Sequence, residues 1–185
     1  PERRVVVPSA PGKRHGHDQK ITDLLYLCHE HARQELPFEE VFARIAERFD
    51  QIIADLGLSL DLSEQFATIR RQIAALAIGG GGPDYAASRG EFLNGQLLAA
   101  ALDYEFVDAA EVILFDGLGK LDEERTYGAL HARLCDTSGA VVPGFYGSLP
   151  SEHAARYGER WSDASAPEAA FIHGLTRFHD PGRGQ

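Results

Sequence analysis

The chain has 185 residues, of which 44% are hydrophobic and 25% are charged, and its formal net charge is -10 at pH 7. This size suits one globular domain. The negative charge, with no cluster of Lys and Arg interleaved with aromatic residues, argues against nucleic acid as a partner. No apolar run approaches the ~20 residues needed to cross a bilayer, and the N-terminal segment lacks a signal-peptide core. We therefore expect a cytoplasmic protein that binds neither nucleic acid nor membranes.

The first half of the chain predicts one short strand followed by helices. Residues 5–7 (VVV) form an apolar run that Pro8 ends, as expected for a short strand. After a polar loop, apolar residues recur at three- and four-residue spacing, which is typical of amphipathic helices. The predicted helices span residues 19–35, 37–56, 61–78 and 86–102. In the last of them, Gly90 and Gly95 mark positions where another part of the chain packs closely.

The second half changes to short β-rich pieces separated by helices. Strands are predicted at 105–107, 112–115 and 140–146, with helices at 123–135 and 166–178. This alternation indicates an α/β layered domain with a largely parallel sheet. We expect one domain over residues 1–178 and a disordered tail over 179–185.

Cysteine and histidine residues do not predict a disulfide or a metal site. The two cysteines, Cys28 and Cys135, lie far apart in apolar helical patterns, which favours buried reduced thiols. The segments at 15–18 (HGHD) and 28–31 (CHEH) lack zinc-site spacing and are interpreted as solvated polar positions. The glycine run at 79–82 has no P-loop Lys-Ser/Thr after it and is interpreted as a flexible connector.

Five segments follow one another in one collinear order: VVVPSAPGKR (5–14), ITDLL (21–25), SRGEFLN (88–94), YEFVDA (104–109) and VPGFYGSLP (142–150). Together they resemble the aspartate kinases, members of the amino-acid kinase family. The resemblance runs from residue 1 to about 150. It implies a three-layer αβα domain with a largely parallel sheet, the amino-acid kinase (carbamate kinase-like) fold, here truncated at both ends.

The resemblance also has departures. The family begins with a strand that carries a Lys-Phe-Gly-Gly motif for the ATP phosphates, and this motif does not occur in the sequence. The family's later Ser-Arg-Gly-Gly-Ser-Asp motif has its nearest counterpart in residues 160–163 (RWSD), which is one residue short and has Trp161 in place of the glycines. ATP and Mg²⁺ are thus implied by resemblance only, and we expect an incomplete ATP site.

The resemblance implies roles for particular residues. Glu91 would meet the ammonium group of an amino acid, and Ser9 and Thr22 would face the substrate. The alternative for Glu91 is a solvated or helix-paired carboxylate, and for Thr22 and Ser9 a helix N-terminal hydroxyl. Arg160 would bind a substrate carboxylate and Asp163 would assist transfer, although an Arg and an Asp three residues apart are also common on surfaces.

Three functions are compatible with these observations. The first is an aspartate kinase homologue, whose reaction is ATP-dependent phosphorylation of the L-aspartate side-chain carboxylate, the first step toward lysine, threonine and methionine. We expect the chain alone to be inactive in that reaction. The second is a non-catalytic module that binds L-aspartate or a similar amino acid, or that pairs with a complementing chain or another copy of itself. The third is an expressed gene remnant.

Overall fold

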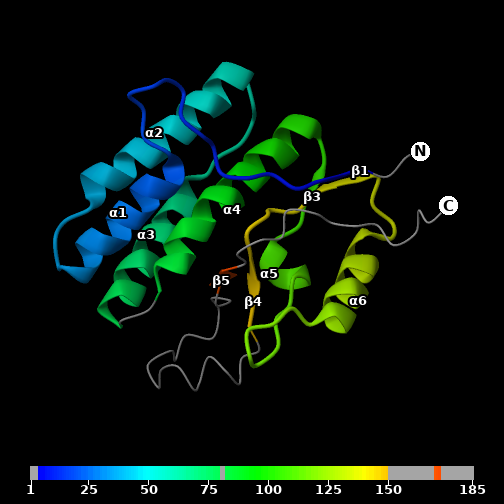
Figure 1. The fold of residues 1–185 in the computed structure, drawn as a ribbon. Helices are drawn as coiled ribbons and strands as arrows, with labels where there is room; N and C mark the ends of the chain where they lie inside the picture. Colours follow the sequence, from blue (N-terminus) through cyan, green and yellow to red (C-terminus); the bar gives the residue numbers. More distant parts are fainter. Residues whose placement is uncertain (1–3, 80–81, 150–168, 172–185) are drawn as a thin grey trace.

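The computed structural model describes residues 4–79, 82–149 and 169–171. Helices and strands alternate along the second half of the chain, whereas the first half is almost entirely helical (Figure 1). In chain order the elements are β1 (Arg4–Val6), α1 (Ile21–Arg33), α2 (Glu39–Leu56), α3 (Ser63–Ile78), α4 (Pro83–Leu102), β2 (Glu105–Phe106), α5 (Ala109–Val112), α6 (Glu123–Leu134), β3 (Gly139–Val141), β4 (Tyr146–Ser148) and β5 (Ala169–Phe171).

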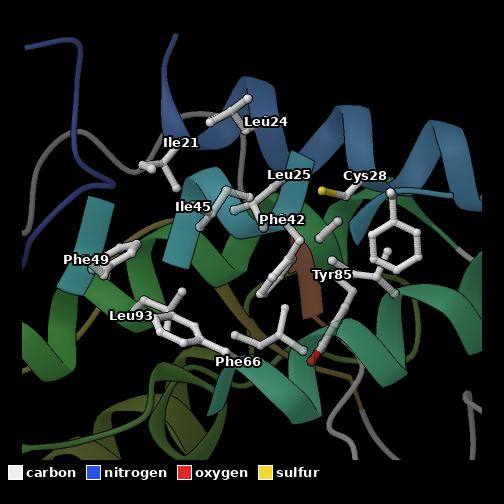
Figure 2. Packing of buried hydrophobic residues seen from close by; sticks show 14 of the residues in the cluster. Ile21, Leu24, Leu25, Cys28, Phe42, Ile45, Phe49, Phe66, Tyr85 and Leu93 are labelled. Carbon is white, nitrogen blue, oxygen red and sulfur yellow. The ribbon is translucent and has the colours of Figure 1, made fainter. Parts of the chain in front are cut away.

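The larger apolar core lies between the first four helices, as Figure 2 shows. Each helix carries apolar residues at the spacing predicted from the sequence, and those residues point into the common core. Burial of so many large side chains is the main source of stability on this side of the molecule. The fully or almost fully buried members include Ile21, Leu25, Cys28, Phe42, Ile45, Phe49, Ile69, Ile73 and Leu93. The four predicted helices are confirmed.

The ends of these helices follow local chemistry. Gly57 ends α2 with a φ of 63°, the left-handed conformation that glycine adopts without strain. At the start of α3, the carboxylate of Asp61 accepts a hydrogen bond from the backbone N–H of Ser63 at 2.9 Å.

Cys28 is a buried thiol on α1, and burial raises its pKa to about 12. Cys135, in contrast, is only partly buried.

Among the described residues, a three-stranded parallel sheet has the strand order β1-β3-β2. Residues 4–6 pair with residues 139–141, and β2 pairs with the last two residues of that same central strand. Gly139 is required there because a Cβ atom would lie 2.7 Å from the ring of Tyr104. The predicted parallel sheet is therefore confirmed.

Helices α4 and α6 contact residues that alternate along β2. Phe106 packs edge-on against Phe92 of α4, with ring centroids 5.5 Å apart. The neighbouring residue, Glu105, instead forms a 2.5 Å ion pair with Arg133 of α6. Because successive strand residues point to opposite faces, α4 and α6 contact opposite faces of the sheet. In Figure 1, α4 accordingly runs between the helical side and the strands.

Two predictions about strands are wrong in detail. Part of the strand expected over 112–115 is the end of the short helix α5, and residues 114 and 115 form only isolated bridges. The carboxylate of Asp108 accepts a hydrogen bond from the N–H of Ala110 at 3.0 Å, and this N-cap starts a helix that the apolar pattern does not reveal.

The strand expected over 140–146 is divided between two sheets. Residues up to Val141 belong to the parallel sheet, and the chain turns at Phe145, whose φ is 79°, before β4 begins. β4 pairs antiparallel with β5, so the helix expected over 166–178 is wrong at residues 169–171. The remainder of that segment and the tail at 179–185 lie outside the described residues. No helix in the described ranges combines the length and the apolar character needed to cross a membrane.

Candidate functional site

A buried carboxylate on α4 faces the loop that follows β1. Glu91 is only 4% exposed. Its Oε1 atom accepts a hydrogen bond from the backbone N–H of Ala10 at 3.1 Å and a longer one from the Ser9 hydroxyl at 3.4 Å. Two segments about 80 residues apart in sequence therefore meet at one carboxylate, and Glu91 is neither solvated nor paired along its own helix.

The second oxygen of this carboxylate is buried without a partner. Within the part of the chain that the structure describes, Oε2 of Glu91 has no hydrogen-bond donor. Burial raises the pKa of Glu91, and the bonds from Ala10 and Ser9 only partly oppose that shift. A buried carboxylate oxygen without a donor is costly, and a cationic donor placed beside it would recover the lost hydrogen bond.

Close packing fixes the loop against α4. A Cβ atom at Gly90 would lie 2.8 Å from the Cβ of Ala10, so only glycine permits this approach, as the sequence predicts. One helical turn further on, Asn94 donates from Nδ2 to the backbone oxygen of Ser9 at 2.6 Å. The predicted close approach at Gly95 is also present, since a Cβ there would lie 2.7 Å from Pro143.

Thr22 lies in the first turn of α1, the helix that packs against α4. Its neighbour Ile21 packs against Gly90, where a Cβ would lie 3.4 Å from the Cγ2 of Ile21. Thr22 is half-buried, and the N-cap of the helix is Lys20 rather than Thr22. Ser9 precedes the helix by a whole loop, so a capping role for its hydroxyl is wrong.

Next to Glu91, α4 also carries a buried guanidinium. Arg89 is 8% exposed, and its Cζ atom lies 4.8 Å from the ring centroid of Tyr85, 4.7 Å from that of Phe92 and 4.9 Å from that of Tyr146. Its Nε and Nη2 atoms both donate to the hydroxyl of Ser88 at 3.1 Å. Cation–π attraction therefore compensates part of the cost of burying this charge.

Arg89 with the rings of Tyr85, Phe92 and Tyr146, here called the Arg89 cluster, connects α4 to the two-stranded sheet of β4 and β5. The hydroxyl of Tyr146, the first residue of β4, donates to the Oδ1 atom of Asp108 at 2.7 Å. Burial raises the pKa of Tyr146 far above its ordinary range, so the phenol stays protonated and remains a donor. Sequence analysis did not single out Arg89, although aromatic residues four before and three after it on one helix are a signal for a stacked cation.

The structure brings together some predicted site residues and leaves others outside. Ser9 and Glu91 are in contact, and Thr22 follows Ile21, which packs against Gly90. Arg160 and Asp163 lie outside the described residues. Among those described, no three His, Cys, Asp or Glu side chains gather as metal ligands would. The carboxylate of Asp18, from the segment considered for metal binding, is held by Arg14 and Arg48.

Comparisons with known proteins point to one family. Aspartokinase 3 of Bacillus subtilis is 33% identical over an alignment of 161 residues, which covers 80% of this chain and 35% of that protein. The solved structure of Clostridium acetobutylicum aspartate kinase matches with a TM-score of 0.77 and 38% identity, over 91% of this chain and 35% of that one. No family model matches the sequence.

The two matches agree in extent as well as in family. The chain spans about a third of the length of the aspartokinase that it matches. The resemblance to the aspartate kinases is therefore confirmed, and it covers about a third of the length of each matched protein.

Proposed function

We propose that this chain is the amino-acid-binding part of an aspartate kinase homologue, whose reaction is the ATP-dependent phosphorylation of the side-chain carboxylate of L-aspartate. The buried Oε2 atom of Glu91, which has no donor among the described residues, carries this proposal. The ammonium group of an amino acid has three N–H donors and a positive charge. It would supply both the missing hydrogen bond and the counter-charge.

The surroundings of Glu91 suit such a ligand. Ala10 and Ser9 occupy only Oε1, so they orient the carboxylate and leave its other oxygen without a hydrogen bond. In a site that excludes water, a charge-assisted hydrogen bond is stronger than one at the surface. The ligand's positive charge would also lower the raised pKa of Glu91 and favour its ionised form.

Hydroxyl and guanidinium groups would bind the carboxylates of the ligand. Thr22 lies in the first turn of α1, which packs against α4, and its hydroxyl is the proposed donor on this side. The Ser9 hydroxyl has one proton, so donating to the ligand would replace its 3.4 Å bond to Oε1 of Glu91. By resemblance, Arg160 would bind a carboxylate and Asp163 would assist transfer. The product of the reaction would enter the synthesis of lysine, threonine and methionine, in the cytoplasm.

We propose no site for ATP and Mg²⁺ among the described residues. The acidic side chains among them do not gather in a group of three, and the guanidinium beside Glu91 is stacked among aromatic rings. Phosphoryl transfer needs cations or backbone amides around the transferred group. We therefore assign amino-acid binding to these residues and derive no step of phosphoryl transfer from them.

We also infer the three-layer αβα amino-acid kinase fold. The sheet is parallel, and α4 and α6 contact residues on its opposite faces, which is the layering that this fold requires. The structural match to an aspartate kinase supports the same inference.

A second candidate function is a module that pairs with another copy or with a complementing chain. It is favoured by β1, which lies at an edge of the sheet among the described residues. Val5 and Val7, in and just after that strand, are 48% and 54% exposed. An apolar sheet edge of this kind is a template for strand addition.

Thermal unfolding with added ligands tests the proposed function. We expect millimolar L-aspartate to raise the melting temperature of the 185-residue chain, because a ligand that binds only the folded state stabilises it by mass action. ATP with Mg²⁺ should leave the melting temperature unchanged and should not be consumed when L-aspartate is present.

The outcomes separate the candidates. A shift with L-aspartate alone supports the amino-acid site, whereas no shift with either ligand contradicts it. A concentration-dependent melting temperature without ligand would instead support pairing through β1. Turnover of ATP with L-aspartate would contradict our assignment of amino-acid binding alone to this chain.

A further inference from the structure

Beyond Ala10, the loop between β1 and α1 is held by polar contacts rather than by a core of its own. Pro8 is buried and Ala10 packs on Gly90, but residues 12–17 and 19–20 are exposed. A segment without apolar packing needs other interactions to keep one conformation. In this exposed segment they converge on Arg48, which belongs to α2, and on Asp18.

Arg48 is 5% exposed and reaches from α2 to both ends of the exposed part of the loop. Its Nη1 atom donates to the backbone oxygen of Gln19 at 3.0 Å, and its Nη2 atom donates to the backbone oxygen of Gly12. Gly12 is two residues after Ala10, and Gln19 is two residues before α1. One planar guanidinium thus fixes the distance between the two ends of the loop.

Asp18 completes the arrangement from within the loop. Its Oδ2 atom lies 3.0 Å from Nη1 of Arg48 and accepts hydrogen bonds from the backbone N–H and Nε of Arg14 at 2.9 and 3.0 Å. These bonds with Arg14 lower the pKa of Asp18 below its ordinary range, so it stays ionised. Burial lowers the pKa of Arg48, and Asp18 opposes that shift.

We propose that Arg48 and Asp18 are positioning residues for the amino-acid site. They hold the loop in the conformation that presents the Ala10 N–H and the Ser9 hydroxyl to Glu91, without touching the ligand themselves. The expected effect on ligand binding rests on the proposed function, because a displaced loop would no longer orient Glu91 toward the ammonium group of an amino acid. The geometry of the loop itself is independent of that function.

A purely structural role of Arg48 would affect stability differently from a positioning role. Arg48 projects from α2, whose apolar face lies in the large helical core, and the Phe42, Ile45 and Phe49 side chains hold that helix without it. Loss of the ion pair should therefore loosen the loop locally and leave the core folded. A general loss of stability would instead affect the core and the loop together.

The test combines hydrogen exchange with ligand binding in three variants of the chain. Arg48→Lys keeps the positive charge but cannot reach both carbonyl oxygens and Asp18. Asp18→Asn keeps the shape but removes the negative charge. Glu30→Gln is the matched control, because Glu30 forms an exposed ion pair with Arg33 that is remote from the loop. Amide exchange at Ala10 is compared with exchange at Leu93 in the core, and L-aspartate affinity is measured by calorimetry.

We expect Arg48→Lys and Asp18→Asn to speed exchange at Ala10 by about tenfold while Leu93 keeps its protection. L-Aspartate should bind these two variants about tenfold more weakly, as expected when a binding group is displaced by a fraction of an ångström. Glu30→Gln should match the wild type in both measurements. Unchanged exchange at Ala10, or equal acceleration at Ala10 and Leu93, would overturn the positioning role.

Failure of the proposed function would look different. If the wild-type chain does not bind L-aspartate, the amino-acid site is wrong, but exchange at Ala10 still decides whether Arg48 and Asp18 position the loop. If the wild type binds and the two variants bind equally well despite faster exchange at Ala10, the positioning role is overturned and the amino-acid site stands.

Discussion

The two sides of α4 hold the molecule together by different interactions. Toward the other helices, α4 contributes Leu93 and Leu97 to a large apolar core. Toward the loop after β1, it presents Glu91, which is buried against a backbone N–H and a hydroxyl. The first side lowers the free energy of the folded state, whereas the second side leaves a buried carboxylate oxygen without a donor among the described residues.

This difference suggests that stability and ligand binding are separable in this chain. Apolar burial is insensitive to pH and to ligand, and the raised pKa of Glu91 indicates that its ionised form is disfavoured without one. Real proteins commonly concentrate such costly groups at functional sites. Substitutions in the helical core should therefore lower stability and leave ligand affinity unchanged, whereas substitutions at Glu91 should mainly change ligand affinity and the pH dependence of stability.

The largest effect is expected in the helical core. Phe49→Ala removes a fully buried ring that packs near Phe66, with centroids 6.4 Å apart. We expect the free energy of unfolding to fall by about 3–5 kcal/mol, measured by urea denaturation. In the fraction that remains folded, affinity for L-aspartate should be close to that of the wild type. A selective loss of affinity would contradict the separation of the two sides.

A smaller effect is expected at the Arg89 cluster. Arg89→Lys retains the charge but loses the planar stacking on Tyr85, Phe92 and Tyr146 and the paired bonds to Ser88. We expect a loss of about 1–2 kcal/mol in unfolding free energy. Urea denaturation of Arg89→Lys beside Arg89→Met would separate the planar group from the charge. If Met is no worse than Lys, the charge itself contributes nothing, and if Lys equals the wild type, the planar group contributes nothing.

Glu91→Gln should change how stability depends on pH. The pKa of Glu91 is raised in the folded state, so protonated Glu91 stabilises the folded wild type fully at pH values below the ordinary pKa of 4.5. This stabilisation is lost as the pH rises through the raised pKa of the folded state. The amide introduced by Glu91→Gln does not titrate, so the wild type should lose stability relative to this variant over this window. Parallel urea titrations across the acidic range measure the difference. A difference that grows in favour of the wild type with rising pH would contradict the assignment.

The smallest effect is expected at an exposed ion pair on α1. Glu30 bonds Arg33 at 2.7 Å, and these contacts lower the pKa of Glu30 to about 2, but both side chains are exposed to solvent. Water and salt screen such pairs. Glu30→Gln should therefore leave the melting temperature at neutral pH unchanged within error. A clear decrease would show that polar contacts on the helical side also carry stability.

Much of the helical side could be predicted from sequence because periodicity reports burial directly. The apolar spacing located α1, α2 and α3, and Gly90 and Gly95 correctly marked close approaches. The sheet side was harder to predict. The strands there have two or three residues, too few for an alternating pattern, and the N-cap at Asp108 decides that α5 is a helix.

The candidate site was only partly accessible to sequence reasoning. Ser9 and Glu91 were assigned to one substrate site through family resemblance, because nothing in local patterns links residues 82 positions apart. The contact between Asp18 and Arg48 was missed for the same reason: Asp18 was interpreted as a solvated polar position, and Arg48 was not singled out within the helix predicted over 37–56. Tertiary contacts of single polar side chains have no periodic signal.

The central claim is that Glu91 binds an ammonium group, and a cycle of two ligands and two variants tests it most directly. Calorimetry would compare L-aspartate with succinate, which keeps both carboxylates but lacks the ammonium, on the wild type and on Glu91→Gln. We predict that the wild type prefers L-aspartate by about a hundredfold and that Glu91→Gln removes most of this preference. If Glu91→Gln weakens both ligands equally, or retains the full preference for L-aspartate, Glu91 does not recognise the ammonium group.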